Sequence, residues 1–87
     1  METIEIKARG RALDRLKALP LHGSQEIVAE DEDEAVFRIE AVPTTDLIDQ
    51  LLTMQTEAEV LQPASLREEM KNRLQRMLEN YQQDMSE

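Results

Sequence analysis

His22 carries the side chain that could most readily do chemistry near neutral pH, because imidazole titrates in that range. It is the only histidine, and the chain has no cysteine. A zinc site needs several imidazole or thiolate ligands, so we expect no metal site here. The ring could sense pH or contact a ligand. Its position just after Pro20 favours a turn residue that bonds to the local backbone.

Five consecutive acids, Glu30 to Glu34, could bind a divalent cation. Calcium-binding loops, however, alternate their oxygen ligands around a tight turn that contains glycine, and this run contains none. The run separates two segments that both have the pattern of strands. We therefore expect a solvated hairpin loop.

Catalytic constellations are not evident elsewhere. Acid–base catalysis by carboxylates needs a pair in one pocket with separated pKa values, whereas the acids here fall on strand outer faces, a loop and helix surfaces. The only glycines, Gly10 and Gly23, cannot form a glycine-rich phosphate loop. We expect no enzyme, no catalytic residue and no cofactor.

Charge is distributed unevenly along the chain. Residues 1–19 hold five basic and three acidic side chains, whereas residues 20–64 hold one basic and eleven acidic, and the whole chain has a net charge of -9. This acidic balance argues against nucleic-acid binding, which needs clustered basic side chains. The early basic residues could contact an anion, but we favour pairing with the acidic middle or with solvent. They are Lys7, Arg9, Arg11, Arg15 and Lys17.

The last third of the chain predicts a long amphipathic helix. Ser65 and Glu68 fit a capping box at its start. Its apolar positions follow helical spacing and form one stripe: Leu66, Met70, Leu74, Met77, Leu78 and Tyr81. The stripe could cover this domain's own sheet or form a subunit interface, including a homodimer. We favour the first, because a small domain needs the burial.

Six further elements precede that helix. Alternation and helical spacing predict strands at 3–8, 25–30, 35–42 and 57–61, and helices at 11–19 and after Thr44 or Thr45. The second helix carries Leu47, Ile48, Leu51 and Leu52. The order βαββαβ predicts an α+β, ferredoxin-like fold: an antiparallel four-stranded sheet, both helices on one face, and an additional C-terminal helix.

Two motifs resemble the C-terminal extension (WCX) domain of bacterial WYL-domain transcriptional regulators. They are LPLHxSQ at Leu19 to Gln25 and VLxPxSLREE at Val60 to Glu69, and the helix that closes on Tyr81 adds to the likeness. The chain departs from the family pattern at Gly23, where a proline is usual. It also departs near Met54 to Thr56, where the family usually has a glycine that would end the second helix.

The resemblance implies a non-enzymatic module for regulation and dimerisation. It also implies an alternative: an effector-sensing domain that shares a small-molecule or nucleic-acid-end pocket with a WYL domain. The family places DNA binding in N-terminal domains that these 87 residues do not contain. We therefore expect Met1 to begin a shortened or split form of such a regulator, with residues 1–82 as one domain and 83–87 as a frayed tail. No segment resembles a signal peptide or a membrane span, so we expect a cytoplasmic protein.

Overall fold

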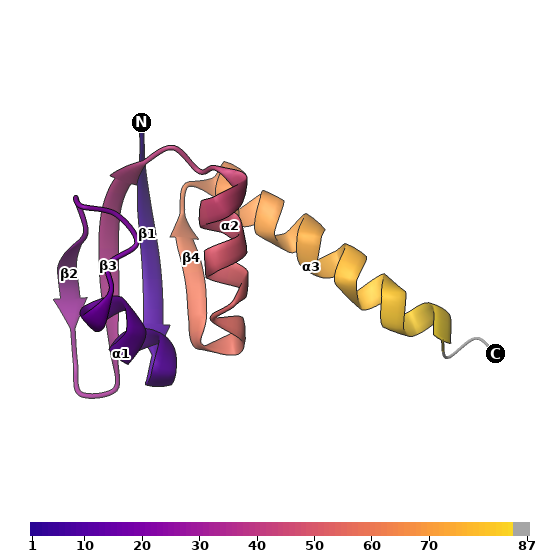
Figure 1. Cartoon of the computed structure of the whole chain (residues 1–87), viewed down its shortest axis with the longest axis horizontal. Helices are drawn as coiled ribbons and strands as arrows, with labels where there is room; N and C mark the ends of the chain where they lie inside the picture. Colours follow the sequence, from indigo (N-terminus) through magenta and orange to yellow (C-terminus); the bar gives the residue numbers. More distant parts are fainter. Residues whose placement is uncertain (85–87) are drawn as a thin grey trace.

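The computed structural model describes residues 1–84. It contains a four-stranded antiparallel sheet in the order β2-β3-β1-β4, three α-helices and one short 3₁₀ helix (Figure 1). This confirms the predicted ferredoxin-like arrangement. The elements are β1 (Glu2–Arg9), α1 (Gly10–Ala18), β2 (Glu26–Glu30), β3 (Glu34–Ala41), α2 (Thr45–Leu52), η1 (Gln55–Glu57), β4 (Ala58–Gln62) and α3 (Ala64–Asp84).

The core lies between the sheet and the helices α1 and α2, which cover the same face (Figure 1). The alternation in β3 shows why: Phe37 and Ile39 are buried, whereas Arg38 between them is not. From the helices, Leu16, Ile48 and Leu51 complete this core. Burial of such side chains stabilises a domain by about 1.5–3 kcal/mol each, so this layer accounts for most of the fold's stability.

The opposite face of the sheet is covered by ion-paired side chains. Arg38 lies between Glu5, at 3.0 Å, and Glu26, at 3.6 Å. Each partner is opposite Arg38 in the strand register. Farther along β1, Thr3 donates a hydrogen bond to Glu40 at 2.8 Å. The middle of this face is therefore polar, although Val36 lies half-buried on the same side of β3.

The bounds of several elements differ from the sequence prediction by one residue. Helix α1 begins at Gly10, and β4 begins at Ala58 because η1 occupies the preceding residues. The cap of α2 is Thr44, whose hydroxyl accepts a hydrogen bond from the Leu47 amide at 3.2 Å. The sequence had left Thr44 and Thr45 as equal candidates.

The predicted capping box at the start of α3 is wrong. The carbonyl oxygen of Pro63 accepts hydrogen bonds from the Leu66 and Arg67 amides, both at 3.1 Å. The helix therefore begins at Ala64, before Ser65. Ser65 lies inside the first turn, and within residues 1–84 its side chain has no capping hydrogen bond. Glu68 pairs instead with Lys71 at 3.5 Å.

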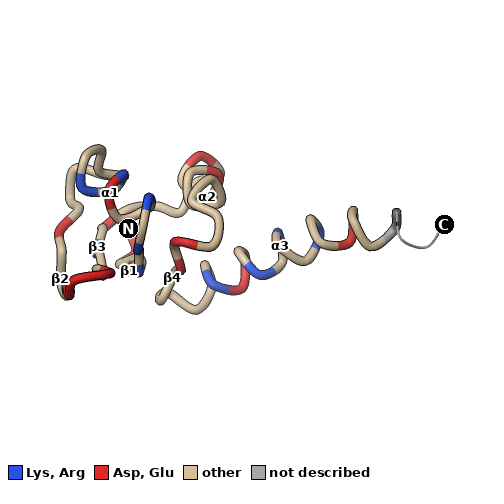
Figure 2. Tube along the Cα trace, turned by 90° about the horizontal axis from the view of Figure 1, so that it is seen from below, with Lys and Arg blue, Asp and Glu red and all other residues tan. Residues whose placement is uncertain are grey.

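Helix α3 leaves the body of the domain and projects into solvent (Figures 1 and 2). Its main contact is with β4, an edge strand, and the molecule extends 47 Å along its longest axis. The preference for packing against the chain's own sheet is therefore wrong beyond Met70. The helix runs to Asp84, past the predicted end of the domain, and residues 85–87 of the predicted tail lie outside the described part.

Candidate functional site

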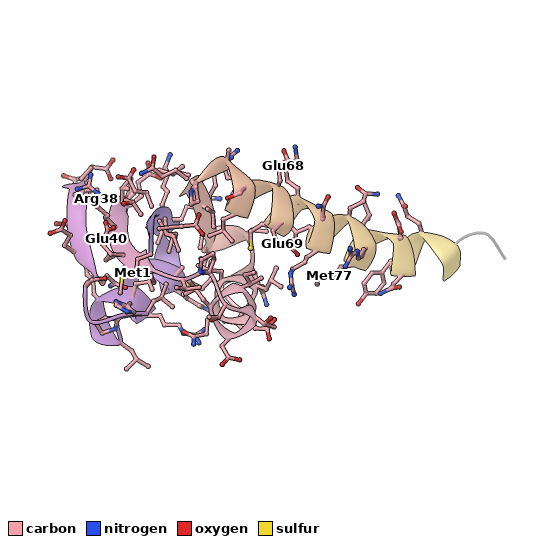
Figure 3. The ribbon with its side chains drawn as sticks, turned by 90° about the horizontal axis from the view of Figure 1, so that it is seen from above. Met1, Arg38, Glu40, Glu68, Glu69 and Met77 are labelled. Carbon is pink, nitrogen blue, oxygen red and sulfur yellow. The ribbon has the colours of Figure 1, made fainter. Side chains whose placement is uncertain are left out.

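The outer part of α3 carries an apolar stripe that is exposed in the described part of the chain. Leu74 is 50% exposed, Met77 48%, Leu78 50% and Tyr81 72%. Figure 3 shows that Met77 and Glu68 project from opposite sides of the helix, as a spacing of nine residues requires. The solvent-exposed part of α3 therefore has a charged face and, opposite it, an apolar face.

The base of α3 is fixed to the body. Leu66 is only 3% exposed within the core, and Met70 is partly buried against it. Arg67 donates a hydrogen bond to the Val60 carbonyl at 2.6 Å and pairs with Glu59 at 3.3 Å. The motif around Leu66 and Arg67 thus sets the angle at which the helix leaves the sheet.

A shallow apolar groove lies where α3 diverges from β4. It encloses about 160 Å³, and Ala58, Val60, Met70 and Leu74 form its apolar lining. Charged side chains at its rim are Glu59, Arg67 and Lys71. Leu74 belongs to both this groove and the exposed stripe, so the two form one continuous apolar surface.

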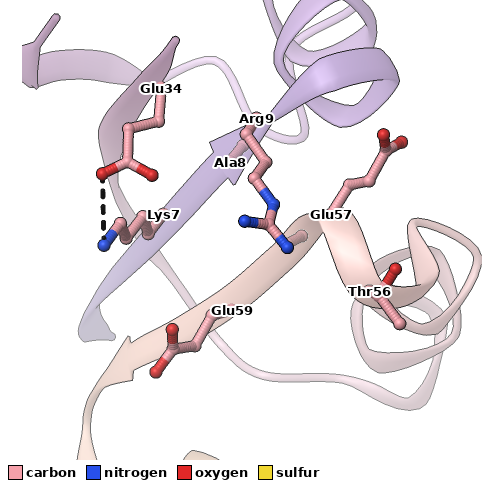
Figure 4. Close-up of a pocket in the computed structure, with 8 residues that line it drawn as sticks. Lys7, Ala8, Arg9, Glu34, Thr56, Glu57 and Glu59 are labelled. Atoms are coloured by element: carbon pink, nitrogen blue, oxygen red, sulfur yellow. Dashed lines mark ion pairs between the residues drawn. The ribbon is translucent and has the colours of Figure 1, made fainter.

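The five predicted anion contacts do not form one patch. Lys7 pairs with Glu34 at 3.2 Å (Figure 4), and Lys17 pairs with Glu30 at 2.6 Å. These pairs agree with the expected pairing to the acidic middle of the chain. The first pair joins β1 to β3, and the second joins α1 to β2, so the two lysines lie on different elements.

The three arginines differ from the two lysines. Arg15 donates a hydrogen bond to the Thr53 hydroxyl at 3.0 Å. Within residues 1–84, Arg9 and Arg11 make no side-chain ion pair. Arg9 lines a hollow of about 140 Å³ between β1 and β4, and its side chain extends across that space (Figure 4). The same hollow is also lined by Glu34, Glu57 and Glu59, and Arg11 lines a separate hollow beside Glu57.

The ring of His22 forms its hydrogen bonds within its own loop, as expected. Its Nδ1 accepts a hydrogen bond from the Ser24 amide at 3.1 Å and lies 2.8 Å from the Ser24 hydroxyl. That hydroxyl also accepts from the Glu40 amide at 2.9 Å. The ring therefore helps attach the loop before β2 to the end of β3.

Gln25, the last residue of the LPLHxSQ motif, also bonds to backbone groups near its own loop. Its side-chain amide donates to the Leu16 carbonyl at 2.9 Å, and its side-chain oxygen accepts from the Leu21 amide at 2.9 Å. Gln25 thereby joins the last turn of α1 to the loop that follows. His22, Ser24 and Gln25 of the LPLHxSQ motif therefore stabilise the connection between α1 and β2.

The acidic run forms the turn between β2 and β3, as predicted (Figure 2). Asp31 accepts hydrogen bonds from the Asp33 and Glu34 amides, both at 2.9 Å. The Asp33 bond, followed by the Glu34 bond, holds the pKa of Asp31 below its usual value. In residues 1–84, no group of three or more acidic, histidine or cysteine side chains is arranged to hold a metal ion.

Glu57 has a role that the sequence reasoning missed. It accepts a hydrogen bond from the Arg11 amide at 3.2 Å and so satisfies a free donor in the first turn of α1. A carboxylate near a helix N-terminus is also favoured by the helix dipole. The two residues are separated by 46 positions, so no local pattern could indicate the contact.

None of the helices in residues 1–84 has the length and apolar composition that a membrane span requires.

Comparison with protein families gave one finding. A family model described as the WCX domain matches residues 1–78. The match includes every strand, α1, α2 and most of α3, together with Leu74, Met77 and Leu78 of the exposed stripe. Neither the curated proteins nor the solved structures gave a match to the chain.

Proposed function

The chain belongs to the WCX domain family, and from this premise we propose that it is a non-enzymatic regulatory and dimerisation module of a WYL-type transcriptional regulator. In this function, α3 binds a partner and so holds two regulator chains together. DNA binding would belong to other domains of the regulator. The observation that carries the proposal is the apolar stripe on α3. Each of its four side chains is about half exposed or more.

Exposed apolar side chains occur singly on most proteins, but a continuous stripe on a projecting helix is typical of an interaction surface. Here the stripe continues into the groove beside β4 through Leu74. Met77 adds a flexible thioether, which adapts readily to a partner surface. The body contributes rigidity, because Leu66 and Arg67 fix the base of the helix.

The non-enzymatic part of the proposal rests on how the polar side chains are used. His22, Gln25 and Asp31 each bond to backbone groups of their own loop. Arg38 is held between two carboxylates on the open face. Each of these groups has a structural role that accounts for its position.

Sedimentation equilibrium of the chain, from low to high micromolar concentration, tests this function. We expect a reversible monomer–dimer equilibrium. A glutamate in place of Leu78 should weaken association at least tenfold, about 1.4 kcal/mol, because a buried charge would have to be desolvated. The matched control is Arg76→Glu, on another face of the helix. A strict monomer at high micromolar concentration would contradict dimerisation by this chain.

A second candidate function is effector sensing, and it is favoured by the side chains of Arg9 and Arg11, which make no ion pair within residues 1–84. In this alternative, these arginines contribute anion contacts to a pocket completed by the WYL domain of the regulator. Nuclear magnetic resonance of the chain titrated with inorganic phosphate tests it. We expect shifts confined to residues around Arg9 and Arg11 that disappear in the Arg9→Ala, Arg11→Ala variant. Shifts that persist in this variant would contradict it.

A further inference from the structure

The spacing of the α3 stripe is that of a helix–helix seam. Met70, Leu74, Met77 and Tyr81 follow one another at intervals of four, three and four residues. This is the alternation by which two helices interlock their side chains. Leu78 widens the stripe beside Leu74 and Tyr81. Such a surface fits another helix better than it fits a flat sheet.

The charges favour one orientation for a second copy of this chain. Residues 1–63 contain six basic and fourteen acidic side chains, a net charge of -8. Residues 64–82 of α3 contain four basic and three acidic, a net charge of +1. Two acidic bodies at the same end of a parallel helix pair would repel each other. An antiparallel pair places the bodies at opposite ends.

Distance makes this separation effective. Helix α3 has 21 residues and is therefore about 30 Å long, several times the screening length of about 8 Å at physiological salt. The flanks also agree with an antiparallel pair. Lys71 and Arg73 of one helix would lie opposite the outer half of the other, where the nearest flanking side chains are Leu78 and Asn80 and carry no charge.

We propose that the exposed stripe is occupied by α3 of a second copy, packed antiparallel. In this arrangement Leu74 contacts Met77 of the second copy, and Met70 contacts Tyr81 of the second copy. The tyrosine ring would then lie at the groove of about 160 Å³ between β4 and α3, whose lining includes Met70. The inference rests on the proposed function and specifies its interface.

Disulfide mapping tests the orientation directly, because the native chain has no cysteine. Met70→Cys and Tyr81→Cys are prepared separately, mixed and oxidised with a glutathione buffer. In the antiparallel pair the two cysteines adjoin, so we expect the mixed 70–81 disulfide as the main product. Each variant alone should stay uncrosslinked, because its two cysteines would be about 16 Å apart along the axis, beyond the reach of about 7 Å.

Arg76→Cys, on another face of α3, is the matched control and should give only background crosslinking. Disulfides of each variant with itself, without the mixed product, would indicate a parallel pair and overturn the inference. A dimer in sedimentation without any of these crosslinks would place the interface elsewhere, which overturns the inference while the proposed function stands. A chain that stays monomeric would overturn both, and would leave another domain of the regulator to cover the stripe.

Circular dichroism of each cysteine variant establishes that it folds. If Met70→Cys does not fold, Lys71→Cys mixed with Leu78→Cys decides in its place, because both positions are exposed on the flanks of the seam. The antiparallel pair places these two flanks opposite each other, so the mixed disulfide should again be the main product. A dimer that forms without this mixed product would overturn the inference.

Discussion

The carboxylate of Glu57 lies directly against Gly10, so close that a β-carbon at Gly10 would overlap it. Gly10 also has a φ of 56°, in the left-handed region. The contact joins the end of η1 to the junction between β1 and α1. It also allows Glu57 to accept a hydrogen bond from the Arg11 amide. The left-handed backbone is the main reason for glycine at this position, because the Glu57 carboxylate is the end of a flexible side chain and can move aside.

Gly10→Ala should destabilise the domain by about 2 kcal/mol, because the left-handed backbone alone disfavours a β-carbon by about 1–2 kcal/mol. Displacement of Glu57 from the Arg11 amide would add to this loss. Urea unfolding monitored by circular dichroism measures the change. Gly23→Ala is the matched control: nothing lies within 4 Å of its added β-carbon. Equal losses in the two variants would contradict the argument.

Gln55→Gly should stabilise the domain. Gln55 has a φ of 56°, in the left-handed region that glycine adopts most readily. Relief of the left-handed backbone strain should raise the free energy of unfolding by about 1–2 kcal/mol. Glycine also gives the unfolded chain more conformational freedom, which lowers it in part, so we expect a net increase of about 0.5–1 kcal/mol. Thermal unfolding measures it, with Thr56→Gly as the control. A lower midpoint for Gln55→Gly would show that its side chain makes a compensating contact.

Strand β3 shows how much of the fold the sequence specifies. Its apolar positions Ala35, Phe37 and Ile39 recur at every second residue, which gives both the strand and its buried face. The positions of the helices follow from equally regular patterns. Each such signal is local, because a strand or helix exposes its periodicity within about ten residues.

The course of α3 could not be predicted in this way. The stripe from Leu66 to Tyr81 has the same spacing whether it covers a sheet or meets another chain. The ion pairs around Arg38 make the middle of the open face polar, and they depend on the register between strands. The contact between Glu57 and Gly10 was likewise hidden, because it joins distant parts of the sequence.

Gln25→Ala should destabilise the domain by about 1–3 kcal/mol, since it leaves the Leu16 carbonyl and the Leu21 amide without partners in a part-buried site. Urea unfolding measures the loss. Gln50→Ala, at an exposed position on α2, is the control and should change stability by less than about 0.5 kcal/mol. A negligible effect at Gln25 would indicate that water replaces both hydrogen bonds.

Asp31→Asn should reduce stability at neutral pH and have little effect in strong acid. The folded-state pKa of Asp31 lies below its usual value of 3.8, chiefly through hydrogen bonds from the Asp33 and Glu34 amides. A lowered pKa means that the charged form is favoured by folding. This stabilisation is therefore present above 3.8 and is lost as the pH falls through the folded-state pKa.

Urea unfolding of both proteins at pH 7 and at successively lower pH tests this dependence. The difference between wild type and variant should shrink as the pH falls, and Glu32→Gln controls for the general loss of an acid from the turn. A difference that stays constant with pH would mean that the asparagine loses hydrogen-bond geometry and that the charge is not responsible.

Leu66→Ala should destabilise the domain far more than Leu78→Ala, although both leucines belong to one helical stripe. Leu66 is 3% exposed and lies in the core, so its truncation should cost about 2–5 kcal/mol through lost burial and the cavity left behind. Leu78 is 50% exposed on the part of α3 that projects from the body. At concentrations below dimer formation, its truncation should cost less than about 0.5 kcal/mol. Urea unfolding at low micromolar concentration measures both, and repetition at high concentration should increase the effect of Leu78→Ala alone. Comparable losses at low concentration would show that the outer stripe is buried within the single chain.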